Sequence, residues 1–81
     1  MADRFTDLVV NRRYRFSLGV DNQSGQYFLS TPISGSSRAV EFEAYYRIDT
    51  AEFEGFRTDP ASAESFLETC RQQGNSDRRI A

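Results

Sequence analysis

The sequence contains no histidine, no lysine and no tryptophan, and its single cysteine is Cys70. Without histidine the chain lacks the commonest general base and the commonest metal ligand of proteins. One cysteine without a histidine cannot form a structural zinc site, a Cys-His nucleophile or an intrachain disulfide. We therefore expect no metal, no cofactor and no catalytic residues, and we predict that the protein is not an enzyme.

We expect neither a signal peptide nor a membrane-spanning segment. Asp3 and Asp7 stand near the N-terminus, where a signal peptide needs basic residues followed by an apolar run. No apolar stretch approaches the length of a membrane-spanning helix. These absences predict a cytoplasmic protein that does not associate with membranes. The net charge of −2 argues against bulk electrostatic binding of nucleic acid.

A chain of 81 residues has room for one small domain. Seven phenylalanines and four tyrosines offset the small size of its core, because each aromatic ring buries a large area. We expect a single domain over residues 1–74, which ends at the helix-stopping Gly74. Residues 75–81 are expected to form a flexible C-terminal tail, in which Ile80 could dock onto the domain.

The first half of the chain has the period of two that is typical of half-buried strands. We predict strands over Arg13–Val20, Gln26–Thr31 and Arg38–Arg47, joined by turns at Asp21–Gly25 and Ser34–Ser37. The side chains expected to face the core from the first and third strands are Tyr14, Phe16, Leu18, Val20, Val40, Phe42, Ala44 and Tyr46. Pro32 is expected near a strand end. Leu8-Val9-Val10 could extend the first strand, form a separate strand or make one helical turn.

The second half of the chain predicts two helices. Asp49 and Glu52 have the spacing of a capping box, and Asp59-Pro60 ends the first helix and begins the second. The expected buried residues of the helices are Phe53, Phe56, Ala63, Phe66, Leu67 and Cys70. The predicted fold is therefore α+β, with an antiparallel meander of three or four strands and two C-terminal helices on one face.

Basic and aromatic residues alternate in Arg12-Arg13-Tyr14-Arg15-Phe16, a composition that can bind single-stranded nucleic acid. On a strand, however, Arg13 and Arg15 would share the solvated face while the aromatic residues join the core. The strand interpretation explains the pattern without a ligand. Nucleic-acid binding by Arg12–Arg15 together with Arg78 and Arg79 is therefore the alternative hypothesis.

Glu41, Glu43 and Tyr45 share the outer face of the third predicted strand. Two carboxylates on one face could act as an acid and a base, but a flat strand face offers no cleft for a substrate. Phe28 and Tyr45 are expected on the same outer face, framed by charged residues as in many interfaces. An edge strand would offer a second route, by β-addition to another protein or to a copy of this chain.

Two stretches of the sequence resemble a family of small bacterial proteins of unknown function. They are Ser24–Ser34, with its Tyr-Phe-Leu-Ser-Thr-Pro run, and Glu41–Ile48, with its Glu-Phe-Glu-Ala-Tyr-Tyr run. The resemblance covers about Val20 to Arg71, including the Asp-Pro break. It implies a bacterial, cytoplasmic origin and assigns no site residues.

The expected function is a protein-interaction module that binds another protein or a second copy of itself. The candidate contact residues on the outer sheet face are Arg13, Arg15, Phe28, Glu41, Glu43 and Tyr45. Cys70 lies on the buried helical stripe with Phe66, and we interpret it as a small core residue.

Overall fold

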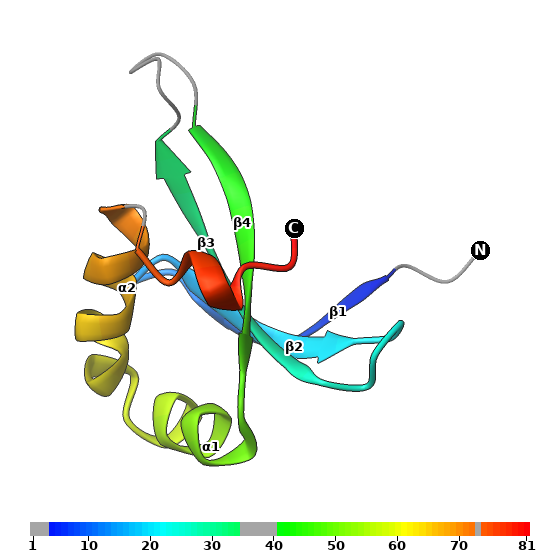
Figure 1. Ribbon diagram of the computed structural model, residues 1–81. Coiled ribbons are helices and arrows are strands. Elements are labelled where there is room, and N and C mark those ends of the chain that lie inside the picture. The colour runs from blue at the N-terminus through cyan, green and yellow to red at the C-terminus, as the bar shows by residue number, and fades with distance from the viewer. Residues whose placement is uncertain (1–3, 35–40, 73) are drawn as a thin grey trace.

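The computed structural model describes residues 4–34, 41–72 and 74–81. Four strands form one antiparallel sheet in the order β1-β2-β3-β4, followed by the helices. The strands are β1 (Phe5–Asn11), β2 (Phe16–Asp21), β3 (Tyr27–Ser34) and β4 (Glu41–Ile48). The helices are α1 (Thr50–Thr58) and α2 (Glu64–Arg71), with 3-10 turns at Pro60–Ala63 and Ser76–Arg78. The predicted α+β meander with two helices on one face is confirmed (Figure 1).

The residues Leu8-Val9-Val10, which the sequence left open, belong to a strand of their own. β1 pairs with β2, and its register shifts between Asp7 and Val9, so that Leu8 is the extra residue of a bulge. The predicted start of the next strand at Arg13 is wrong. β2 begins at Phe16, residues 12–15 form the turn after β1, and Arg15 has a φ of 59°.

β3 is longer than predicted, because it runs through Pro32 to Ser34. The pairing of β2 with β3 covers Tyr27 to Ser30, so Pro32 lies where β3 extends beyond β2. A proline is tolerated there because no strand on that side requires its missing N–H. The predicted turn at Ser34–Ser37 lies outside the described residues except for Ser34, and so do residues 38–40 of the third predicted strand.

The core lies between the sheet and the helices, as the alternation predicts. Its main cluster comprises Phe16, Leu18, Leu29, Ile48, Phe53, Phe56, Ala63 and Leu67. A smaller cluster contains Ile33, Ala44, Tyr46 and Cys70. The expectation that Phe42 belongs to the core is wrong. It is 36% exposed, under the guanidinium of Arg79 at 5.2 Å.

The N-terminus of α1 has the predicted capping box. The Asp49 carboxylate accepts a hydrogen bond from the Glu52 N–H at 2.7 Å, and the Glu52 carboxylate accepts one from the Asp49 N–H at 3.0 Å. These bonds satisfy two groups that the helix itself cannot pair. Asp59-Pro60 was predicted to begin the second helix, but the Asp59 side chain makes no capping bond there. Instead its carbonyl accepts hydrogen bonds from the Ser62 N–H and hydroxyl, and the chain passes through a 3-10 turn before α2.

Gly19 lies in the middle of β2, between Asp7 of β1 and Phe28 of β3. A Cβ atom at this position would overlap the Thr6 carbonyl oxygen and would lie 2.8 Å from the Phe28 ring. Only glycine leaves room for both neighbours. The close approach of β1 and of the Phe28 ring therefore depends on the absence of a side chain here.

Asp21 is buried at the end of β2 and organises the turn to β3. Its carboxylate accepts hydrogen bonds from both Nε and Nη2 of Arg4 at 3.2 Å, from the Gln23 N–H at 2.9 Å and from the Ser24 hydroxyl. The hydrogen bond from Arg4, with those from Gln23 and Ser24, lowers the pKa of Asp21 against the opposing effect of burial. Gly25, with a φ of 76°, completes the turn that the sequence predicted.

Residues 75–81, predicted as a tail, lie along β4. The Ile80 N–H donates to the Tyr45 carbonyl at 2.9 Å, and the Tyr45 N–H donates to the Ala81 carbonyl at 3.0 Å. Tyr46 and Arg79 form an antiparallel bridge. The segment therefore occupies part of the edge of β4. None of the helices in the described ranges is both long and apolar enough to cross a membrane.

Gly19→Ala should lower the free energy of unfolding by about 2 kcal/mol, because the added methyl group overlaps β1 and Phe28. Urea unfolding followed by circular dichroism measures the change. Gly55→Ala in α1 is the matched control, since its Cβ would meet nothing within 4 Å. The control should be neutral or stabilised by about 1 kcal/mol. Equal stability of Gly19→Ala and wild type would contradict the tight contact.

Asp21→Asn should remove part of the acid sensitivity of folding. The folded pKa of Asp21 lies below its ordinary value of 3.8, so its stabilising effect is complete above that value. The effect is lost as pH falls through the folded pKa. The urea midpoint of wild type should therefore drop steeply below about pH 4. Asp21→Asn should be less stable at pH 7 and should lose less on acidification. Asp59→Asn, at a carboxylate without a capping bond, should keep the steep loss.

Candidate functional site

Three aromatic rings from three different strands meet on the outer face of the sheet. The Phe5 ring stacks on the Tyr45 ring with centroids 4.0 Å apart, and it meets the edge of the Phe28 ring at 5.2 Å. Phe28 and Tyr45 contact each other at 5.3 Å. The prediction that Phe28 is an exposed contact residue is therefore wrong. Phe5 covers it, and its exposed fraction is 0%.

Tyr45 keeps part of its surface accessible beside these rings. Burial raises the pKa of its hydroxyl, and the negative charges of Glu43 and Asp7 raise it further. The hydroxyl is therefore neutral at physiological pH, when it can donate one hydrogen bond and accept others. Of the two predicted outer aromatic residues, Tyr45 is the one that a partner could reach.

The predicted charged residues Arg15, Glu41 and Glu43 do lie together. Arg15 donates a hydrogen bond from Nη2 to the Glu41 carboxylate at 3.0 Å, and both side chains are exposed. Arg15 and Glu43 also line a shallow groove of about 310 Å³ on the outer face. The full lining of this groove is Val10, Asn11, Arg12, Arg15, Phe16, Ser17, Pro32 and Glu43.

Arg13 lies away from that groove, contrary to its predicted place beside Arg15 on a strand face. Its guanidinium lies 5.5 Å from the centre of the Tyr14 ring. It lines a separate groove of about 580 Å³ between the β1–β2 turn and α2, together with Glu64, Glu68 and Arg71. Residues 12–15 form a turn rather than a strand, and Arg15 lines both grooves whereas Arg13 lines only the one at α2.

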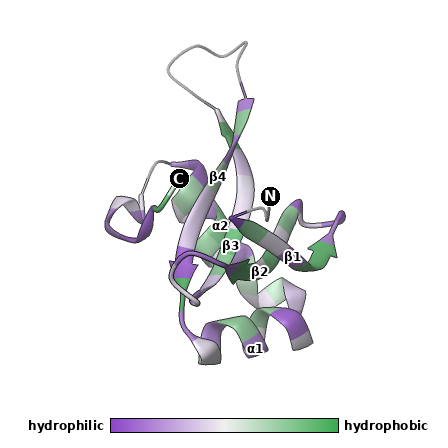
Figure 2. Ribbon diagram, turned by 90° about the vertical axis from the view of Figure 1, so that its right-hand side faces the viewer, coloured by the Kyte–Doolittle hydropathy of each residue, from purple (hydrophilic) through white to green (hydrophobic). Residues whose placement is uncertain are grey.

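Sequence reasoning missed the edge strand β1 as the most exposed apolar element. Leu8 is 56% exposed and Val10 is 60% exposed. β1 pairs with β2 on one side, and no other described strand pairs with it on the opposite side. In Figure 2 the hydrophobic colouring of β1 lies at the margin of the sheet. The run Leu8-Val9-Val10 carried the signal, but its exposure depends on the order of the strands.

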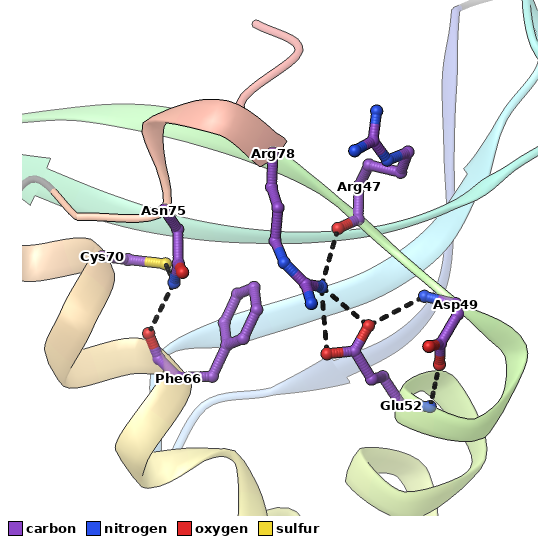
Figure 3. A network of polar contacts seen from close by, with 7 residues as sticks. All are labelled: Arg47, Asp49, Glu52, Phe66, Cys70, Asn75 and Arg78. Carbon is purple, nitrogen blue, oxygen red and sulfur yellow. Dashed lines mark hydrogen bonds and ion pairs between the residues drawn. The ribbon is translucent and has the colours of Figure 1, made fainter.

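The opposite edge of the sheet is occupied by the C-terminal segment. Arg78 donates from Nη1 to both carboxylate oxygens of Glu52, at 2.7 and 3.0 Å, and to the Arg47 carbonyl (Figure 3). The hydrogen bond from Arg78 to Glu52 raises the pKa of Arg78. Since Glu52 also closes the capping box of α1, one carboxylate links the helix start to the segment that covers β4.

The arginines proposed to bind nucleic acid lie apart from one another, and some of them already contact acidic or aromatic side chains. Arg78 is paired with Glu52, and Arg79 lies over the Phe42 ring. Arg15 is paired with Glu41. Arg12 and Arg13 form no ion pair with any residue that the structure describes. Two arginines in one turn provide little positive charge for binding a polyanion such as nucleic acid.

The thiol of Cys70, the remaining reactive side chain, is buried in the core. Burial raises the pKa of this thiol. The Asn75 amide donates to the Cys70 sulfur at 3.4 Å, and Figure 3 shows the two side chains next to each other. Within the described ranges no group of three or more acidic or cysteine side chains could hold a metal ion.

No protein-family model, curated protein or solved structure matches this chain. The resemblance to a family of small bacterial proteins therefore stays a prediction.

Phe5→Ala should lower the free energy of unfolding by about 2 kcal/mol, because it removes a ring that packs on two others. Urea unfolding of Phe5→Ala, Tyr45→Ala and the double variant forms a double-mutant cycle. The coupling of the stacked rings should be about 1 kcal/mol. Phe42→Ala, at a partly exposed ring on the other face, should show no coupling to Tyr45→Ala. A coupling of zero between Phe5 and Tyr45 would contradict the stack.

Proposed function

We propose that this chain is a small bacterial protein of the cytoplasm that acts as a non-enzymatic protein-interaction module. Its binding element is the edge of β1, to which a partner adds a strand. The observation that carries the proposal is the exposure of Leu8 and Val10 on this edge. An unpaired edge presents N–H and C=O groups to solvent, and main-chain hydrogen bonds to an added strand satisfy them.

The contrast between the two sheet edges supports this proposal. Residues 80–81 hydrogen-bond to the β4 backbone at Tyr45, so that edge is partly protected. Proteins that stay monomeric usually cover an edge, shorten it or place charges along it. β1 has seven residues, and the consecutive residues Leu8, Val9 and Val10 at its centre carry no charge. Such an edge is suited to association.

The surroundings of β1 have the composition of an interface. Val10 forms an apolar end of the outer groove, and Arg12, Arg15 and Glu43 supply polar groups around it. An apolar centre with a polar rim is the usual arrangement in protein interfaces. Of the residues predicted from the sequence, Arg15, Glu41, Glu43 and Tyr45 belong to this outer surface. Phe28 is buried beneath this surface, where its ring packs against Phe5 and Tyr45.

Photo-crosslinking in the native cell tests the proposal. A photoreactive phenylalanine analogue would replace Leu8 or Val10 in separate variants, and Ala51 on α1 would serve as the exposed control position. We expect a crosslinked protein product from positions 8 and 10 and none from position 51. Equal labelling at all three positions, or none at positions 8 and 10, would overturn the proposal. A product that nuclease removes would support the nucleic-acid alternative instead.

A further inference from the structure

We propose that the strand added to β1 is β1 of a second copy of this chain, in antiparallel orientation. This inference rests on the proposed function, because it names the partner of the same edge. Two four-stranded sheets would then join into one continuous sheet related by a two-fold axis. The argument for a second copy comes from the distribution of charge along β1.

An acidic side chain lies in the first half of β1, and a basic one follows its last residue. Asp7 lies in its N-terminal half, and Arg12 directly follows its last residue, Asn11. Both side chains are exposed, and neither forms an ion pair with any described residue. An antiparallel second copy brings each Asp7 toward the Arg12 of the other chain. A parallel arrangement would align like charges, which is unfavourable for directly opposed side chains.

The two faces of the strand allow this alignment. Asp7 is opposite Gly19 and Val10 is opposite Ser17, so both face the outer side, because the bulge at Leu8 lies between them. Side chains directly opposite each other in an antiparallel pair share a face. If Asp7 is opposite Val10 of the second copy, Arg12 of that copy lies on the diagonal, within reach of a long side chain. Two such ion pairs form, one at each end.

Arg4 also lies near this edge, and its charge is already paired within its own chain. In the same alignment Arg4 of one copy approaches the end of the strand that carries Arg13 in the other. Arg4 makes a two-point contact with the Asp21 carboxylate within its own chain. The repulsion between the two arginines is therefore reduced.

The geometry also limits the assembly to two copies. The hydrogen bonds between residues 80–81 and Tyr45 occupy part of the β4 edge, so each outer edge of the joined sheet is partly covered. Pairing through β1 alone uses the same surface on both copies and closes at a dimer. A β4 edge that was open would permit further addition and a fibre.

Charge reversal tests the proposal with purified protein in sedimentation equilibrium. Wild type should dimerise, and Asp7→Arg or Arg12→Glu alone should each weaken the dimer by about tenfold to a hundredfold, since both ion pairs become repulsions. An equimolar mixture of the two variants should recover a heterodimer with wild-type affinity, because each reversed residue meets its opposite. Glu54→Arg, at an exposed position on α1, is the control and should dimerise as wild type does. Circular dichroism verifies that each variant is folded.

Wild type that stays monomeric at millimolar concentration would overturn the second-copy proposal, as would a mixture that fails to recover the dimer. Neither result affects crosslinking from positions 8 and 10 to a different protein, which would uphold the proposed function alone. If crosslinking from these positions is also absent, both proposals fail.

Discussion

The absence of a side chain at Gly19 is the constraint on which the sheet depends. It leaves space for the Thr6 backbone on one side and the Phe28 ring on the other. Phe5 can then reach Phe28 and Tyr45, and β1 is attached to the outer face by its first residue. The same arrangement leaves the middle of β1, with Leu8 and Val10, without a covering element among the described residues. Gly19 thus permits the closed part of this face, and the place of β1 at the end of the strand order leaves the other part open.

The features that could be predicted from the sequence are those with local causes. Alternation identified the core face of β2 and β4 at Phe16, Leu18, Ala44 and Tyr46, because the period of a strand is set within the strand itself. The capping box of Asp49 and Glu52 spans three residues, and its hydrogen bonds follow from that spacing. Short connections then favoured the meander.

The errors concern contacts between residues far apart in the sequence. Phe28 was expected to be exposed because its strand has apolar residues on both faces, and nothing near it indicates that Phe5 covers it. Arg13 was placed on a strand because the alternation continues through the turn that the chain makes at Arg15. The exposure of β1 follows from its place at the end of the strand order, which no local pattern encodes. Sequence reasoning therefore named the exposed charged residues Arg15, Glu41 and Glu43 of the outer face, but it missed the exposed apolar residues of β1.

The ion pair between Arg78 and Glu52 has a consequence for the order in which contacts form while the protein is being synthesised. The contact joins residues 26 positions apart, and Tyr45 meets Ile80 over a still longer separation. Contacts of this span form after local ones, because a longer loop has to be closed. On the ribosome, the β4 edge stays unprotected until residues 78–81 have emerged. During that interval a nascent chain exposes two sheet edges. Nascent chains on adjacent ribosomes of one mRNA are then most prone to pair their strand edges with each other.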